Sequence, residues 1–248
     1  MAGLVNFKDP EEVKEYLSNT EIEFMFGCHK EKDADCCYRL GEFLETIRKK
    51  FPEAATTYKE CCDKYKNAPC CFKVGQYHML GKGGLEKSEL EAFKYYRSAC
   101  QQEKYRDQGK NDRLATACCN MALLLQQDEK SRKPFVDYLK TVEETEKPVQ
   151  SRILEALQKS CALNDAVGCN VLSYFYMKGF EDLKPNLRLA AKYAEKSCEL
   201  GDYRGCHNIS LMHARGDGVE KSYERAKSFS EKKEKLMNQS TSLSFGNT

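Results

Sequence analysis

The chain lacks a long apolar run and has almost no net charge. No segment of its 248 residues approaches the ~18 consecutive apolar residues that a membrane-spanning helix requires. Its 40 Lys and Arg side chains balance 38 Asp and Glu, so the net charge is +2, and the two signs are interspersed. Such a chain has no strong field around it, and the composition therefore predicts no membrane span and no nucleic-acid partner.

The short motifs of common catalytic and metal sites are also missing. There is no Cys-x-x-Cys, and the four His residues do not cluster with cysteines at ligand spacing, which disfavours a metal site. Nothing resembles a Ser-x-x-Lys or Gly-x-Ser-x-Gly context. The glycine-rich segments 81–84 and 216–219 are followed by neither a strand nor Lys-Ser/Thr, so they predict turns rather than phosphate cradles. We expect a protein that is not an enzyme, with no catalytic residue and no cofactor.

Cysteine, in contrast, is abundant, at 14 residues. In five pairs, the first cysteine ends one expected helix and the second begins the next: Cys28 and Cys37, Cys62 and Cys71, Cys100 and Cys118, Cys161 and Cys169, Cys198 and Cys206. In four of these pairs the spacing leaves about one helical turn on each side of a tight reversal, which brings the Cα atoms into disulfide range. We predict at least five disulfides in an oxidising compartment, each contributing up to roughly 2–3 kcal/mol.

Residues at fixed distances from these cysteines share their character, which indicates a repeat. An apolar and then a small residue stand three and four positions after the second cysteine: Leu40 and Gly41, Val74 and Gly75, Met121 and Ala122, Leu172 and Ser173, Ile209 and Ser210. Eight and four positions before the first cysteine stand Ala54 and Tyr58, Ala92 and Tyr96, Ile153 and Leu157, Ala190 and Ala194. Small residues let a neighbouring helix approach closely, so these positions predict the contact faces of two helices per unit.

A period in the mid-thirties with two helices per unit and no strand-like alternation is typical of an α-solenoid. The stretches 91–100 and 189–198 resemble the second helix of Sel-type, tetratricopeptide-related repeats, which implies an all-α solenoid of helical hairpins stapled by disulfides. We predict one solenoid over 1–238, with a half-unit helix at 10–28, an insertion at 128–147 and a flexible tail at 239–248. Its units are expected at about 34–65, 68–104, 110–163, 165–200 and 202–237, the last being a cap with Glu234 in place of the terminal cysteine.

The first twelve residues contain no basic segment, no apolar signal core and no Arg-rich amphipathic helix. A cleaved signal for secretion or for import into the mitochondrial matrix is therefore not indicated. An oxidising compartment that proteins enter without such a signal is the mitochondrial intermembrane space, where small helical hairpins are trapped by oxidation of paired cysteines. We predict that location for this chain.

The segments 28–33, 37–40, 80–85 and 243–246 resemble the Sel-repeat assembly factors of cytochrome c oxidase. The resemblance implies a non-enzymatic scaffold for assembly of respiratory-chain complexes, chiefly cytochrome c oxidase. The implied partners are respiratory subunits, other assembly factors and the oxidative import machinery. One alternative is a ligand-binding or hydrolase-like protein of the kind found among cysteine-rich Sel-repeat proteins of bacteria. Another is a carrier of thiols, copper or haem.

Four cysteines fall outside the five pairs and are candidate extra thiols: Cys36, Cys61, Cys70 and Cys119. Cys61 is expected either to be a small buried side chain or to pair with Cys36 or Cys70. The doublet Cys70-Cys71 resembles the copper-binding doublet of copper chaperones, and soft thiolates select Cu(I), but Cys71 is expected to pair with Cys62. His29, His78, His207 and His213 offer too many choices to identify a haem ligand. The candidate partner contacts are aromatic residues of the first helices, of which half or more are alternatively expected to be core residues: Tyr38, Phe72, Tyr77, Tyr174, Tyr176 and His207.

Overall fold

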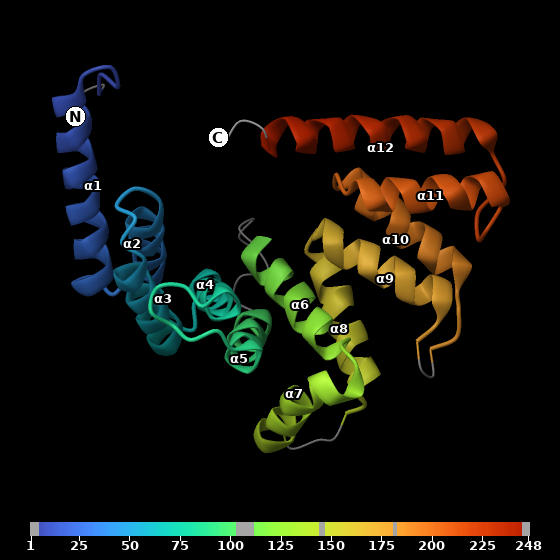
Figure 1. Cartoon of the computed structure of the whole chain (residues 1–248), viewed down its shortest axis with the longest axis horizontal. Helices are drawn as coiled ribbons and strands as arrows, with labels where there is room; N and C mark the ends of the chain where they lie inside the picture. The colour runs from blue at the N-terminus through green and yellow to red at the C-terminus, as the bar shows by residue number, and fades with distance from the viewer. Residues whose placement is uncertain (1–4, 103–111, 144–146, 181–182, 245–248) are drawn as a thin grey trace. The chain divides into compact units, whose positions relative to one another are not determined.

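A computed structural model of the chain describes residues 5–102, 112–143, 147–180 and 183–244 (Figure 1). Within these ranges the chain forms twelve α-helices, and its only β-structure is an isolated bridge between Phe180 and Leu183. The contacts divide the chain into two compact units, Met1–Gln102 and Glu103–Thr248. The predicted all-α fold of helical hairpins is confirmed. That the hairpins form one continuous solenoid over 1–238 stays a prediction.

The first unit holds a single helix followed by two hairpins: α1 (Pro10–His29), α2 (Ala34–Thr46), α3 (Phe51–Tyr65), α4 (Ala68–Leu80) and α5 (Glu89–Cys100). We call the first helix of each hairpin its A helix and the second its B helix. The A helix α2 packs on α3 and α4 packs on α5, while α1 packs on α2 and α3 on α4. Helix α1 thus stands where a B helix would stand, as the predicted half-unit.

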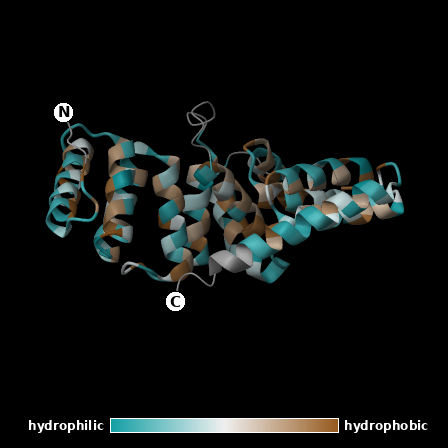
Figure 2. Ribbon diagram, turned by 90° about the horizontal axis from the view of Figure 1, so that it is seen from above, coloured by the Kyte–Doolittle hydropathy of each residue, from teal (hydrophilic) through white to brown (hydrophobic). Residues whose placement is uncertain are grey.

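The second unit holds three hairpins and one additional helix: α6 (Asp112–Leu125), α7 (Glu129–Val142), α8 (Val149–Ala162), α9 (Ala166–Lys178), α10 (Leu187–Glu199), α11 (Tyr203–Arg215) and α12 (Tyr223–Ser244). Helix α6 packs on α8, α9 on α10, and α11 on α12, and successive hairpins are joined through α8 with α9 and α10 with α11. Figure 2 shows hydrophilic and hydrophobic residues mixed along the helices, as expected of amphipathic elements. Among the described residues, no helix is long and apolar enough to cross a membrane.

The A and B helices of a hairpin approach closely at the predicted small residue, through one of two kinds of contact. In the first unit this residue is Gly41 or Gly75, and a Cβ atom there would collide with the ring of Tyr58 or Tyr96 on the B helix. In the second unit the hydroxyl of Ser173 donates a 2.7 Å hydrogen bond to the carbonyl of Ala190, four residues before Ala194 on α10. Ser210 makes the same 2.7 Å bond to the carbonyl of Ala226. Both kinds of contact need a small side chain because the two helix backbones approach closely.

A second recurring contact joins the end of the A helix to the middle of the B helix. Seven residues after the second cysteine of the pair stands a ring that stacks on a ring of the B helix: His78 on Tyr95, Tyr176 on Tyr193, and His213 on Phe229. The ring centroids are 5.6–5.8 Å apart. The Nδ1 atoms of His78 and His213 also lie 3.0 Å from the carbonyl oxygens of Glu86 and Glu220 in the following turns. These two histidines therefore have packing roles, which fits their equivalent places in the repeat.

The glycine-rich segments form turns, as predicted. Gly81 and Gly216 follow directly after α4 and α11 and have φ values of 64° and 85°. A left-handed residue at the end of a helix favours glycine because a Cβ atom is disfavoured there. The turn lets each A helix stop and the chain return to its B helix.

Helical residues occur in both the predicted insertion and the predicted tail. The insertion at 128–147 contains a helix, α7, which is capped by Asp128 and buries Phe135 and Leu139. It packs on α6, so its apolar stripe is part of the core of the second unit. Helix α12 continues to Ser244 and so includes the first residues of the predicted flexible tail, whose residues 245–248 lie outside the described part of the chain. Neither Gly nor Pro interrupts the sequence before Gly246, so nothing there ends the helix sooner.

Candidate functional site

Within each unit the structure brings cysteines together where a B helix is followed by the next A helix. In the first unit Cys28 pairs with Cys37 and Cys62 with Cys71, with Cα–Cα distances of 4.5 and 4.8 Å. In the second unit the pairs are Cys161 with Cys169 at 4.6 Å and Cys198 with Cys206 at 4.4 Å. The remaining predicted pair, Cys100 with Cys118, would join the two units, and it stays a prediction.

Each junction has a second shared feature, an Asp or Asn that caps the A helix four residues before the second cysteine: Asp33, Asn67, Asp165 and Asp202. In each case the side-chain oxygen accepts a hydrogen bond from a backbone amide of the first helical turn. Such a cap fixes the direction in which the helix starts, and with it the position of the cysteine one turn later. The sequence signal was available, since these acids and amides occur at a constant distance from the cysteines.

One of the open alternatives for the extra cysteines is realised. Cys61 pairs with Cys70, with a Cα–Cα distance of 6.0 Å, so the junction between α3 and α4 carries two adjacent bridges. The alternative pair of Cys36 with Cys61 is not formed. Both sulfurs of the Cys70-Cys71 doublet are thus in disulfides, and Cu(I) would find thiolates there only after both bridges were reduced.

Cys36 occupies the position equivalent to Cys70 in this second bridge, but its partner cysteine is missing. The position equivalent to Cys61 at the junction between α1 and α2 is Gly27, and a Cβ atom on Gly27 would lie 2.5 Å from Cys36 Sγ. Cys36 therefore stays a free thiol, and it donates a 3.4 Å hydrogen bond to the carboxylate of Asp33. Partial burial, together with that carboxylate, raises the pKa of Cys36 above its usual range. A raised pKa disfavours the thiolate and hence nucleophilic reactivity.

Cys119, the other free thiol, lies on α6 and is 1% exposed. Burial raises its pKa to about 12, with a smaller contribution from the charge of Asp165. A thiol of this kind is a small apolar side chain of the core rather than a reactive group. Neither free cysteine has the exposed, acidic character that a thiol carrier uses.

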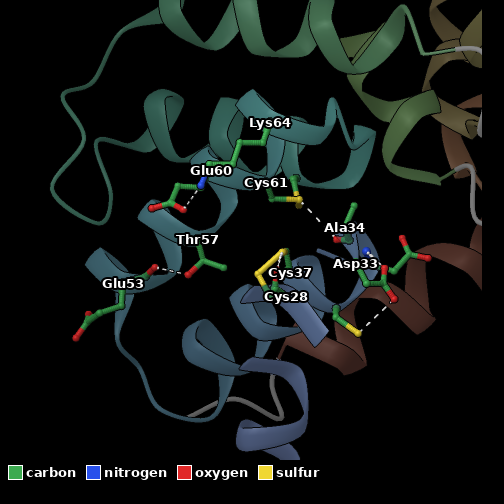
Figure 3. The surroundings of a disulfide bond; sticks show 12 residues. Cys28, Asp33, Ala34, Cys37, Glu53, Thr57, Glu60, Cys61 and Lys64 are labelled. Atoms are coloured by element: carbon green, nitrogen blue, oxygen red, sulfur yellow. Dashed lines mark hydrogen bonds and ion pairs between the residues drawn. A yellow bond between two sulfur atoms is a disulfide. The ribbon is translucent and has the colours of Figure 1, made fainter. Parts of the chain in front are cut away.

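A cavity of about 650 Å³ lies in the first unit beside the Cys28–Cys37 bridge. It is lined by the turn between α1 and α2, by the bridge, and by one face of α3 (Figure 3). The α3 face is polar, with Lys64 paired to Glu60 at 2.9 Å and Thr57 bonded to the carbonyl of Glu53 at 2.9 Å. In the described part of the chain no three His, Cys, Asp or Glu residues are placed to hold a metal ion. The cavity is thus an open recess with polar side chains on its α3 side.

The candidate aromatic contacts differ in exposure. Phe72, Tyr77 and Tyr176 are buried in the core of the hairpins, which is the expected alternative for half or more of the candidates. Sequence periodicity places a ring on a helix but does not say which of two neighbouring faces is covered. Tyr174 is 50% exposed and His207 is exposed, so both remain candidates, whereas Tyr38 is partly buried and its hydroxyl donates to Glu42.

Comparisons with known proteins agree with this architecture. A family model of the Sel1 repeat matches residues 68–104, 166–202 and 204–232. The chain is 36% identical to cytochrome c oxidase assembly factor 7 of Danio rerio, covering 91% of this chain and 90% of that protein. The identity to the protein of that name from Homo sapiens is also 36%, with the same coverage. The chain belongs to the cytochrome c oxidase assembly factor 7 family.

The first two Sel1 matches cover the hairpins α4–α5 and α9–α10 of this family member, and the third covers α11 and the first half of α12. The relative from Xenopus tropicalis is 34% identical over 94% of this chain and 92% of its own. Among solved structures, a Sel1 repeat protein from Oxalobacter formigenes is similar with a TM-score of 0.65, covering 90% of this chain and 80% of that one. Their sequences are 18% identical, so this likeness shows the fold alone. Sel-type repeats in a chain of the assembly factor 7 family thus confirm the predicted family.

Proposed function

We propose that this chain supports the assembly of cytochrome c oxidase as a protein-binding scaffold that catalyses no reaction itself. The observation that carries the proposal is its 36% identity to cytochrome c oxidase assembly factor 7 of Homo sapiens over 91% of the chain. Stacked helical hairpins support a binding role because they present extended surfaces to partner proteins. The partners in this proposal are oxidase subunits or other assembly factors, and other respiratory complexes are included as clients.

The cysteine framework supports a location in the mitochondrial intermembrane space. Bridges such as Cys62–Cys71 and Cys161–Cys169 are buried between helices and hold neighbouring hairpins together. Such bridges persist where thiols are oxidised and are rare in the cytosol. Oxidation during folding would retain the chain in that compartment, so the oxidative import machinery is a further partner in this proposal.

The test is loss and restoration of cytochrome oxidase in cells from which the chain has been removed. We expect loss of the chain to lower the amount of assembled oxidase on native gels, and the wild-type chain to restore it. The free-thiol variant Cys119→Ala should restore it as well, because its thiol forms no bridge. Assembled oxidase at a normal level without the chain would contradict the assembly role.

Location is tested separately in isolated mitochondria. The chain should resist protease while the outer membrane is intact and be degraded once that membrane alone is ruptured, with a matrix protein as the protected control. Alkylation before and after reduction should show that its bridged cysteines are oxidised there. Protection after rupture of the outer membrane would place the chain in the matrix and contradict the proposed location.

A further inference from the structure

Three positions on the exposed face of α1 hold apolar residues where every other B helix has polar ones. We number B-helix positions backward from the first cysteine of each pair, with Glu234 taking its place on α12. The positions two, three and six residues before it carry only polar side chains on the five other B helices: Glu60, Lys59 and Thr56; Ser98, Arg97 and Lys94; Lys159, Gln158 and Glu155; Lys196, Glu195 and Lys192; Lys232, Glu231 and Ser228. On α1 the same three positions hold Phe26, Met25 and Ile22.

These three side chains are largely open to solvent in the structure. The exposed fractions of Ile22, Met25 and Phe26 are 61%, 46% and 56%. They stand at i, i+3 and i+4, so they form one contiguous stripe along the last turns of α1. The core of the unit does not use this stripe, because α1 contacts α2 through other residues such as Phe24, whose ring lies 6.3 Å from that of Phe43. An apolar stripe at positions that are polar in all other repeats indicates a surface that another molecule covers.

The charge on α1 identifies the chemistry of that molecule. The helix carries five glutamates and one lysine; Lys14 lies 3.8 Å from Glu11, and Glu21 is paired with Arg48 at 2.6 Å. Glu15 and Glu11 stand seven and eleven residues before Ile22, which places them on the same side of the helix as the apolar stripe. Both carboxylates are exposed, so the face is apolar at its C-terminal end and acidic at its N-terminal end.

We propose that this face of α1 binds a basic amphipathic helix of another protein. The partner helix would cover Ile22, Met25 and Phe26 with its apolar stripe and place Lys or Arg side chains against Glu15 and Glu11. The distance along α1 from Glu11 to Phe26 corresponds to about 22 Å, which is the length of a partner segment of about fifteen residues. A second copy of α1 packed in parallel fits less well because its own acidic residues would face these glutamates, and an antiparallel copy would place its acidic end against the apolar stripe; an anionic lipid surface is disfavoured by the same glutamates.

The test uses the full-length oxidised protein and a fluorescent synthetic peptide of sixteen residues. The peptide carries Leu at helical i, i+3 and i+4 spacing and Lys at the remaining positions. A control peptide of the same composition has its leucines distributed around the helix. We expect binding of the patterned peptide by fluorescence anisotropy, at least tenfold tighter than binding of the control peptide and weakened by added salt.

Three variants assign the binding to α1. Phe26→Ser and Ile22→Ser should each weaken binding of the patterned peptide at least tenfold, and Glu15→Gln should reduce its salt dependence. The matched control is Leu80→Ser, which removes an apolar side chain that is 71% exposed at the end of α4, and it should change binding less than twofold. Circular dichroism and the melting temperature show whether each variant is folded, and a variant that is not folded is replaced by Met25→Ser.

Four results would overturn the proposal. They are equal binding of the two peptides, binding unaffected by the α1 variants, a dimer in sedimentation that Phe26→Ser abolishes, and tighter binding to phosphatidylserine vesicles than to the peptide. The assay contains no oxidase subunit, so its failure would leave the proposed assembly role untouched. Conversely, failure of that role in cells would leave the binding measurement intact.

Discussion

The carboxylate of Glu45 accepts hydrogen bonds from two lysines and one tyrosine of the first unit. Removing its charge tests how much these contacts stabilise the unit. Its Oε2 atom accepts hydrogen bonds from Lys73 Nζ at 2.8 Å and from the buried hydroxyl of Tyr58 at 3.2 Å. Its Oε1 atom accepts from Lys82 Nζ at 3.0 Å. One side chain of α2 thereby connects α3, α4 and the glycine-rich turn. The perturbation is Glu45→Gln, which keeps the shape and removes the charge.

The expected loss of stability depends on how far the side chains of Glu45, Lys73 and Lys82 are buried. The side chains of Glu45 and Lys73 are 15% and 13% exposed, and that of Lys82 is 32% exposed. Breaking a fully buried pair costs about 3–5 kcal/mol because a charge is left without its partner. Partial exposure of Lys82 reduces this, so we expect a loss of roughly 2 kcal/mol in the free energy of unfolding. For a chain of this size that lowers the melting temperature by about 4–8 °C.

The pH dependence separates the charge of Glu45 from its shape. Burial raises the pKa of Glu45, but the hydrogen bonds from Lys73 and Lys82 lower it by more, so the folded-state pKa lies below the ordinary value of 4.5. A depressed carboxyl pKa contributes stability above the ordinary value, and this contribution is lost as the pH falls through the folded-state pKa. The difference between wild type and Glu45→Gln should therefore be full at pH 7 and shrink below about pH 4.

The assay is thermal unfolding of the oxidised protein at a series of pH values, followed by circular dichroism. The control variant is Glu60→Gln, whose partner Lys64 lies at 2.9 Å but whose side chains are 52% and 62% exposed. It should leave the melting temperature within about 1 °C of wild type, because solvent screens an exposed pair. A Glu45→Gln variant that melts within 1 °C of wild type at pH 7, or one whose deficit is the same at pH 3 as at pH 7, would refute the assigned role.

Two further predictions concern the cysteines. Cys161→Ser should lower the melting temperature more than Cys198→Ser. The Cys161–Cys169 bridge joins two hairpins in the interior of the second unit, whereas the Cys198–Cys206 bridge borders the last hairpin. Equal melting temperatures of both variants and wild type without reductant would show that these sulfurs are not bridged. Gly27→Ala should lower the melting temperature, because the added Cβ atom would lie 2.5 Å from Cys36 Sγ and 2.8 Å from Cys36 Cβ. Thermal unfolding checks this, and a variant that melts together with wild type would contradict the close approach of α1 to Cys36.

The hairpins and most of their bridges could be predicted from sequence because cysteine spacing and small residues are local signals. A distance of nine residues between Cys28 and Cys37 leaves room only for a short turn. The stacked rings were harder to find, because the same position holds His78 in one repeat and Tyr176 in another, and only their partners on the B helices show the equivalence. The Glu45 network joins residues far apart in the chain, and no periodicity indicates it.

The fate of the aromatic candidates shows a different limit. Tyr77 and Tyr174 are both large rings on A helices, but Tyr77 is 2% exposed and Tyr174 is 50% exposed. The distinction depends on which helix covers which face, and that is decided by tertiary packing rather than by the helical period. A sequence-based choice of partner contacts therefore mixes core residues with surface residues until the neighbouring helices are placed.

In a repeat protein, a residue type that recurs at equivalent positions is explained by the stacking of the hairpins. A residue type that differs in one repeat alone needs another cause. The cap four residues before the second cysteine and the small residue four after it serve folding, and they recur as Asp33 with Gly41 and as Asp202 with Ser210. The apolar stripe on α1 departs from the register without any benefit to the core, because its side chains are exposed. Apolar exposure at a site where every equivalent residue is polar costs solubility and contributes nothing to folding. A binding partner is the explanation that accounts for both the position of the stripe and its acidic extension.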